Sequence, residues 1–234
     1  MTCFYGIGIG PGDSELVTVK ASQLLGQLDI LYTPQGKKGA KSLALSIAQP
    51  YLSEEVEIKV RHFPMTRYLA KKEKEWIQIA HEIQADILAG KEVGFITLGD
   101  PMVYSTYSYL LNYLAPEVPT KTIPGITSFT SMAAELGQPL VLDEESLAII
   151  PATAGTEKIR QALQIHENLV IMKVAPRLEE VLLLLREENL LSKASLVSHA
   201  SRPDQVIISN LEDLDPNASL SYFTSMIVKK TPLN

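Results

Sequence analysis

The chain has 234 residues but only one cysteine, Cys3, and one tryptophan. A single cysteine excludes an internal disulfide framework and a metal site built from clustered cysteines. Cys3 begins an apolar segment, so we expect it to be a buried thiol. No apolar run approaches the ~18 residues needed to span a bilayer, and no signal-peptide pattern is present. These absences favour a soluble, cytoplasmic protein of a reducing compartment, with no membrane partner.

The chain also lacks an excess of positive charge. It has 21 Lys and Arg against 27 Asp and Glu, which gives a formal net charge of −6. Without a basic tract, such a chain is a poor ligand for nucleic acid, and we expect no nucleic-acid partner. An anionic substrate would need a local basic patch. The four histidines show no metal-ligand spacing, so we expect no protein-bound metal.

Short apolar runs alternate with amphipathic segments, which is typical of α/β proteins with a mostly parallel sheet. In the first part of the chain this alternation predicts both strands and helices. The predicted strands are residues 3–9, 29–33, 56–60, 92–98 and 120–125, and the predicted helices are 17–27, 42–51, 71–90 and 127–136.

The segment "LGQPLVLDEES", residues 136–146, interrupts this pattern with glycine, proline and acidic residues. We therefore expect two α/β domains, 1–140 and 141–234. In the second, five apolar runs share only two good helical segments, at 156–164 and 177–188. That ratio favours a mixed, partly antiparallel sheet.

The opening stretch "YGIGIGPGDSELVT", residues 5–18, resembles a dinucleotide-binding loop only in its glycines. A Rossmann G-x-G-x-x-G motif would need glycine at Pro11 or at Asp13. An acid at the start of the helix would also repel a pyrophosphate. Asp13 or Ser14 is instead a plausible N-cap. These features disfavour NAD(P) binding. Asp29 could still serve as an acidic ribose partner, so this alternative stays open.

Two further loops follow predicted strands. "GFITLGDPMVYSTYSYLL", residues 94–111, contains Gly99-Asp100-Pro101, and "IPGITSFTS" begins at residue 123. Loops at the carboxyl ends of parallel strands are where open α/β sheets bind ligands. A carboxylate there suits an amine or ribose hydroxyls better than a phosphate.

Together, the G-x-G-P-G-D turn with "LVTVKA", the G-D-P loop and the P-G-I-T-S turn resemble the tetrapyrrole methylases over nearly the whole chain. The resemblance implies two α/β domains with a cleft between them for S-adenosylmethionine, S-adenosylhomocysteine as product, and a homodimer. "LDILYTPQGKKGAKSLALSIAQPYL", "HFPM", "GFITLGDPMVYST" and "LVIMKV" are most similar to members that methylate C-20 of precorrin-2 or cobalt-factor II.

The resemblance also implies site residues. Those lining the cofactor site in the first domain are Pro11, Leu98, Gly99, Asp100, Val103, Tyr104, Ser105 and Thr106, with Thr127 and Ser128 at the methionyl end. The adenine pocket would comprise Met172, Ala200 and Met226, although pattern alone favours core packing for the two methionines. A base must remove the C-20 proton, and the candidates are Tyr104, Asp100 and His199.

The tetrapyrrole substrate is a polycarboxylate, and two basic segments could bind it. Lys37, Lys38 and Lys41 form one segment; Arg61, His62, Arg67, Lys71 and Lys72 form the other. We expect substrate contacts from Lys37, Lys38, Arg61 and Arg67, with a solvated loop as the alternative for both segments. The other readings that stay open are a methylase for another ring carbon or for RNA, an NAD(P)-dependent oxidoreductase, and a non-catalytic tetrapyrrole carrier.

Overall fold

A computed structural model describes residues 2–35, 42–63, 69–212, 214–215, 218 and 220–231, without the side chains of residues 69–72. The chain divides into two compact units, Met1–Thr127 and Ser128–Asn234. The boundary predicted from the sequence lies at residue 140. The difference is helix α5 (Ser128–Leu136), which groups with the second unit because it packs against strand β10 (Thr224–Lys229).

Among the described residues of the first unit, five strands form one parallel sheet in the order β3-β2-β4-β1-β5. This confirms the predicted parallel sheet. Each strand lies within two residues of its predicted limits. The strands are β1 (Phe4–Gly8), β2 (Ile30–Gln35), β3 (Glu57–His62), β4 (Val93–Thr97) and β5 (Thr120–Ile123).

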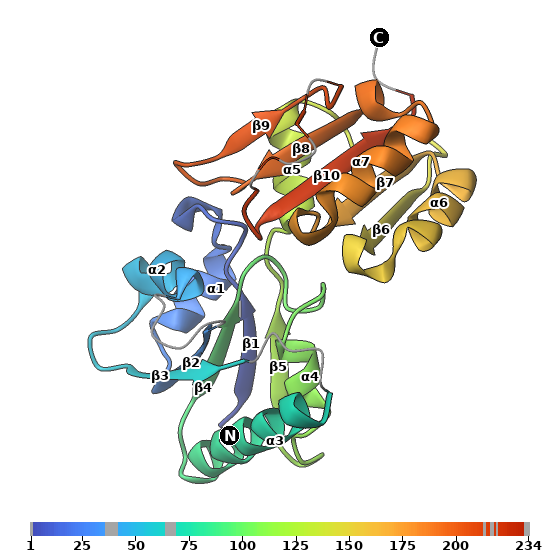
Figure 1. The fold of residues 1–234 in the computed structure, drawn as a ribbon. Helices are drawn as coiled ribbons and strands as arrows, with labels where there is room; N and C mark the ends of the chain where they lie inside the picture. Colours follow the sequence, from blue (N-terminus) through green and yellow to red (C-terminus); the bar gives the residue numbers. More distant parts are fainter. Residues whose placement is uncertain are drawn as a thin grey trace. The chain divides into compact units, whose positions relative to one another are not determined.

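Helices cover both faces of this sheet (Figure 1). Helices α3 (Leu69–Leu88) and α4 (Tyr107–Leu111) lie on one side, and α1 (Val19–Leu25) and α2 (Leu43–Ala48) lie on the other. Successive strand residues point to opposite faces. Ile30 and Tyr32 of β2 therefore pack in the core beneath α3, whereas Leu31 packs with α1 and α2. The inner strands β2, β4 and β1 are buried on both sides, which explains their nearly continuous apolar sequences, whereas the edge strands β3 and β5 are largely exposed.

The second unit has a mixed sheet, as predicted. Its described strands run in the order β6-β7-β10-β8-β9, with β6 parallel to β7 and the other pairs antiparallel. The side chains on one face of this sheet form a single core with helices α6 (Thr156–Ile165) and α7 (Leu178–Glu187). The remaining strands are β6 (Leu147–Pro151), β7 (Asn168–Met172), β8 (Ala194–Ser198) and β9 (Val206–Ile208).

A buried lysine anchors the start of β6. Lys229, only 2 % exposed, donates to Glu145 at 2.8 Å, and the buried Asn168 amide donates to the same carboxylate at 3.0 Å. Ser146, which follows Glu145, is held by Glu167. The Glu167 carboxylate accepts from the backbone N–H of Ser146 at 2.8 Å and from its hydroxyl at 2.6 Å. The acidic segment before β6 is thus tied to the ends of β7 and β10. A buried charge of this kind persists only when it is paired and hydrogen-bonded.

These contacts stabilise the ionised carboxylates. Hydrogen bonds from Ser146 lower the pKa of Glu167 to about 2, and those from Lys229 and Asn168 lower the pKa of Glu145. A lowered pKa in the folded state contributes stability that is fully present above the unfolded pKa and is lost as the pH falls.

In the first unit, the carboxyl ends of β1, β4 and β5 come into backbone contact through glycine. A Cβ atom added to Gly8 would lie 2.6 Å from the nitrogen of Gly125 and 2.7 Å from the carbonyl oxygen of Gly99. A Cβ on Gly125 would lie 2.8 Å from the carbonyl carbon of Gly8. Real Cβ atoms do not approach backbone so closely. Glycine is therefore required where these three strand ends meet.

We expect Gly8→Ala to destabilise the chain by about 1–3 kcal/mol, because the new methyl group meets backbone atoms that cannot rotate away. The measurement is the free energy of unfolding in urea. Gly26→Ala is the matched control, since its Cβ would lie at an ordinary 3.5 Å from the Tyr51 carbonyl oxygen. The control should change stability by less than about 0.5 kcal/mol. Equal effects at both positions would contradict the close junction.

Acid titration tests the hydrogen bonds from Ser146 to Glu167 before β6. The wild-type chain should lose unfolding free energy as the pH falls from about 4.5 towards 2, because protonating Glu167 gives up its hydrogen bonds to Ser146. Glu167→Gln should flatten that part of the profile. Glu179→Gln, which removes an exposed carboxylate from α7, is the charge-matched control. Parallel curves for wild type and Glu167→Gln between these pH values would refute the assignment.

Candidate functional site

Three loops meet at the carboxyl edge of the first sheet, and they are those expected from the sequence. They follow β1 (residues 9–13), β4 (98–106) and β5 (124–127). The first two are joined by backbone, because Gly99 N–H donates to the Gly10 carbonyl at 2.7 Å in an antiparallel bridge. Both glycines have positive φ, 78° at Gly10 and 65° at Gly99. The opening turn and the G-D-P loop therefore form one structural unit with the P-G turn.

Three of the four glycines in the opening stretch each have a structural reason. The place where a Cβ of Gly6 would lie is filled by the ring of Tyr107 from α4. Gly8 makes the strand-end junction, and Gly10 takes a left-handed backbone. The Asp13 side chain accepts the Glu15 N–H at 2.8 Å and caps the 3-10 turn Ser14–Leu16. Helix α1 itself is capped by Thr18, whose hydroxyl accepts the Ala21 N–H, so the N-cap predicted at Asp13 or Ser14 belongs to the turn before the helix. The stretch is thus shaped by packing and by capping.

Asp100 ties two of the loops together. One carboxylate oxygen accepts the Met102 N–H at 2.8 Å, within its own loop, and the other accepts the Gly125 N–H at 3.0 Å, across to the P-G turn. The sequence predicted a ligand contact for Asp100 and did not predict these structural bonds. An ionised carboxylate has about four acceptor positions, so a ligand contact and the two backbone bonds are compatible.

Of the residues after Asp100, Tyr104 is exposed and Ser105 is buried. Tyr104 has φ 49° and is 48 % exposed, so a rare backbone conformation presents this side chain at the surface. Ser105 is only 7 % exposed; its hydroxyl donates to Thr97 at 3.1 Å and accepts the Tyr107 N–H. Ser105 therefore fixes the start of α4. The predicted site residues Pro11, Leu98, Val103, Thr106 and Thr127 are partly exposed in the same three loops.

The charge of these loops restricts the ligands they suit. Residues 9–13, 98–106 and 124–127 include Asp13 and Asp100 but no lysine or arginine. A phosphate needs cationic or convergent N–H donors, whereas here two N–H groups are already used by Asp100. Carboxylate, hydroxyl and backbone carbonyl groups suit an ammonium, a sulfonium or a ribose diol. The three loops fit a nucleoside ligand without phosphate.

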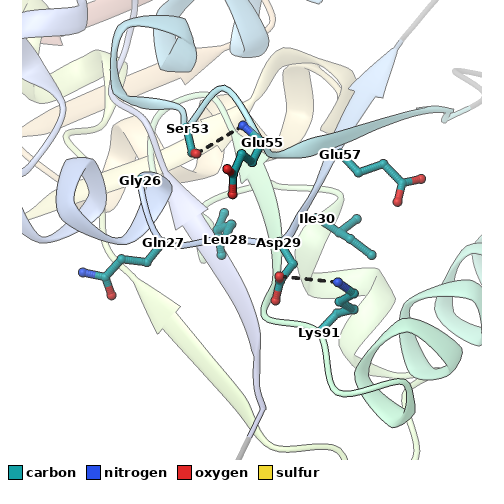
Figure 2. A pocket seen from close by; sticks show the side chains of 9 residues that line it. All are labelled: Gly26, Gln27, Leu28, Asp29, Ile30, Ser53, Glu55, Glu57 and Lys91. Carbon is teal, nitrogen blue, oxygen red and sulfur yellow. Dashed lines mark hydrogen bonds and ion pairs between the residues drawn. The ribbon is translucent and has the colours of Figure 1, made fainter.

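Asp29, the acid that a dinucleotide site would need, lies at the opposite edge of the sheet. It precedes β2, accepts the Glu92 N–H at 2.8 Å and pairs with Lys91 at 3.6 Å. It lines a pocket of about 430 Å³ at the amino ends of β2, β3 and β4. Figure 2 shows it there with Glu55, Glu57 and Lys91. An acid at that edge cannot serve the loop after β1.

In the second unit, the predicted cofactor residues lie on or beside strands. Met226 of β10 is fully buried in the core with α6 and α7, and Ala200, 7 % exposed, follows β8. Met172 ends β7 and is partly exposed, and Ser128 begins α5. Their cofactor contacts stay predictions.

His199, a candidate base, directly follows β8. Both of its ring nitrogens have partners, Asp204 at 2.9 Å and Ser221 at 2.5 Å. These two partners were not singled out by the sequence, because they lie five and 22 positions further along the chain.

Of the basic residues predicted to bind substrate, Arg61 lies in β3 and forms an ion pair within the protein. Its Nε donates to Glu82 at 2.6 Å, and its guanidinium lies 5.6 Å from the centroid of the Tyr32 ring. His62, also in β3, contacts the Gln35 carbonyl at 3.1 Å. Lys37, Lys38, Lys41 and Arg67 lie outside the described residues, as do the side chains of Lys71 and Lys72.

The described part of the chain contains neither a cluster of metal ligands nor a helix that could span a membrane. No three His, Cys, Asp or Glu side chains within residues 2–35, 42–63 and the described part of 69–231 gather so that they could hold a metal ion. Of the helices described, none is long and apolar enough to cross a membrane.

Comparison with known proteins adds sequence relatives over nearly the full length. The chain is 42 % identical over 226 residues to the cobalt-precorrin-2 C(20)-methyltransferase of Salmonella typhimurium, covering 97 % of this chain and 95 % of the relative. It is 31 % identical to the precorrin-2 C(20)-methyltransferase of Sinorhizobium sp., covering 95 % and 93 %.

Solved structures share the fold. A cobalt precorrin-4 methyltransferase superposes with a TM-score of 0.73 at 18 % identity, covering 97 % of this chain and 94 % of that one. The uroporphyrin-III C-methyltransferase of Thermus thermophilus, in complex with S-adenosylhomocysteine, gives 0.71 at 20 % identity, covering 97 % and 92 %. The family model of the tetrapyrrole (corrin/porphyrin) methylases matches residues 3–215. The chain therefore belongs to the tetrapyrrole methylases.

Proposed function

We propose that this chain is an S-adenosylmethionine-dependent C-methyltransferase that adds one methyl group to C-20 of precorrin-2 or cobalt-factor II in cobalamin biosynthesis. The observation that carries the proposal is the 42 % identity to a cobalt-precorrin-2 C(20)-methyltransferase over 97 % of the chain. That span includes all three loops at the carboxyl edge of the first sheet.

The loops suit the proposed cofactor chemically. S-adenosylmethionine has an ammonium, a sulfonium, a carboxylate, a ribose diol and adenine, but no phosphate, and when bound it supplies an activated methyl group. Leu98, Gly99 and Asp100, with Pro11, would hold it at the strand ends. Val103, Tyr104, Ser105 and Thr106 would lie beside it. Thr127 and Ser128 would hydrogen-bond its methionyl end, and Met172, Ala200 and Met226 would contact adenine.

The protein's share of the chemistry is orientation, exclusion of water and proton handling. Asp100 holds the G-D-P loop against the P-G turn, which keeps the backbone of both loops fixed before any ligand arrives. Tyr104, Asp100 and His199 are the candidates for removing the C-20 proton. Of the three, Tyr104 is the most exposed, and its backbone has a positive φ.

The proposal also includes the substrate contacts and the assembly. Lys37, Lys38, Arg61 and Arg67 would bind substrate carboxylates, and Arg61 would do so while held in place by Glu82. A homodimer is proposed from the family resemblance. A cytoplasmic location is proposed because the single cysteine, Cys3, is a free, buried thiol.

Mass spectrometry of the product tests the reaction and the substrate together. The purified chain with S-adenosylmethionine should add one CH₂ to precorrin-2 or to cobalt-factor II, and the faster of the two in side-by-side assays identifies the natural substrate. The identity to the Salmonella relative, a cobalt-precorrin-2 methyltransferase, exceeds that to the Sinorhizobium relative, which favours the cobalt-containing substrate.

Calorimetry separates the alternatives. Binding of S-adenosylhomocysteine without binding of NADH supports the methyltransferase; binding of NADH alone would point to an oxidoreductase. Tetrapyrrole binding without any mass gain would point to a carrier. A methyl group found at another ring carbon would reassign the position.

Asp100→Asn tests how the loops are held. The amide nitrogen would face one of the two backbone N–H donors that the carboxylate now accepts, so we expect a loss of about 1–3 kcal/mol in unfolding free energy and weaker binding of S-adenosylhomocysteine. Asp13→Asn is the matched control in the neighbouring loop, because asparagine caps a helix as well as aspartate does. Both quantities unchanged in Asp100→Asn would show that the bonds to Met102 and Gly125 are dispensable.

A further inference from the structure

The turn after β8 has an unusual backbone. His199 and Ser201 have φ values of 54° and 61°, although neither is glycine, and they flank Ala200. Side chains with a Cβ rarely adopt the left-handed region, and two such residues in one turn persist only where the surroundings hold them. The contacts around this turn show what holds it.

The imidazole of His199 is gripped at both nitrogens. Nδ1 lies 2.9 Å from the Asp204 carboxylate, and Nε2 lies 2.5 Å from the Ser221 hydroxyl. A carboxylate only accepts hydrogen bonds, so Nδ1 carries a proton, and in the neutral ring Nε2 accepts from Ser221. Arg202 donates to the same oxygen of Asp204 at 3.0 Å. The ring is thus fixed in one orientation and one tautomer.

This set of residues could be mistaken for the nucleophilic Ser-His-Asp arrangement. However, the Phe223 N–H donates to the Ser221 hydroxyl at 3.3 Å, and the Ser221 carbonyl accepts from the Thr224 hydroxyl at 2.7 Å. Ser221 is therefore folded back on its own turn before β10. These bonds assign the hydroxyl to holding the imidazole.

Further bonds connect the turn to three other segments. His199 N–H donates to the Phe223 carbonyl at 3.0 Å, and Ser201 N–H donates to the Gln205 side chain at 2.6 Å. The hydroxyls of Ser201 and Ser131 are in contact, which reaches α5. The turn is anchored by its neighbours before β9, before β10 and on α5, and only 7 % of Ala200 is exposed within it.

We infer that Asp204 and Ser221 are positioning residues for the cofactor: by fixing His199 at both nitrogens, they hold the turn His199–Ser201 in the shape that presents Ala200 to the adenosine part of S-adenosylmethionine. This inference rests on the proposed function and on the predicted contact of Ala200. Asp204 and Ser221 touch His199, and it is through His199 that they would act on the cofactor. Their loss should therefore weaken cofactor binding more than it slows the chemical step.

The test uses the full chain and S-adenosylhomocysteine in calorimetry. Asp204→Asn removes the charge that strengthens the hydrogen bond from Nδ1, and Ser221→Ala removes the hydroxyl at Nε2. Each should raise the Kd for S-adenosylhomocysteine about tenfold, the size expected when a charge-assisted hydrogen bond is weakened or a neutral one is lost. In the double variant, the Kd should rise by less than the product of the two single increases, because both substitutions act on one ring. Ser221→Thr keeps the hydroxyl and should restore the wild-type Kd.

Steady-state kinetics separate positioning from general damage. In Asp204→Asn and Ser221→Ala, KM for S-adenosylmethionine should rise while kcat and KM for the tetrapyrrole stay near wild type. A fall in kcat at an unchanged KM for S-adenosylmethionine would overturn the inference and point to His199 as the base for the C-20 proton. Glu187→Gln is the matched control, since it removes another ion pair of the second unit, that with Arg160 between α6 and α7. It should leave all three quantities unchanged.

The outcomes are distinct. If wild type binds S-adenosylhomocysteine and Asp204→Asn and Ser221→Ala bind it equally well, the inference is wrong and the proposed function stands. A parallel rise in KM for both substrates with a lowered melting temperature would also overturn it, in favour of a purely structural role. If wild type does not bind, the proposed function fails and the inference fails with it. Should Asp204→Asn not fold, the comparison of Ser221→Ala with Ser221→Thr decides.

Discussion

The close backbone approach of three strand ends is the constraint on which the candidate site depends. Gly8, Gly99 and Gly125 lie so near one another that a single Cβ at Gly8 or Gly125 would meet backbone atoms. This junction lets a bridge form between Gly10 and Gly99, and it places the Gly125 N–H within reach of Asp100. The shape of all three loops follows from it, because each loop departs from a strand end whose position the junction fixes.

Buried polar contacts play a similar part in the second unit. Lys229, Glu145 and Asn168 tie the acidic segment before β6 to the ends of β7 and β10, while His199, Asp204 and Ser221 hold the turn after β8. Both sets join residues that are far apart in sequence. Polar groups in such places are stable only when each finds a partner with good geometry. They therefore specify one arrangement of their segments.

Much of the fold could be predicted because it depends on local pattern. The alternation of Phe4 and Ile7, or of Tyr32 and Leu31, between two cores follows from the period of two in a strand. The ratio of strands to helices after residue 146 correctly indicated a mixed sheet. The loops after β1, β4 and β5 could be recognised as a candidate site because glycine, proline and polar residues follow apolar strands. Their contacts with a cofactor stay predictions.

By itself, the sequence determined the fold class, most element limits and the family, since periodicity, caps and motifs are properties of neighbouring residues. Only the tertiary structure decided the partners of each polar side chain. It put Asp29 at the amino edge of the sheet, away from the loop after β1, and it gave both oxygens of Asp100 to backbone N–H groups. It also placed Ser221 against a histidine 22 positions earlier. Such pairings depend on how strands are ordered in a sheet, and strand order brings together residues that no local pattern relates.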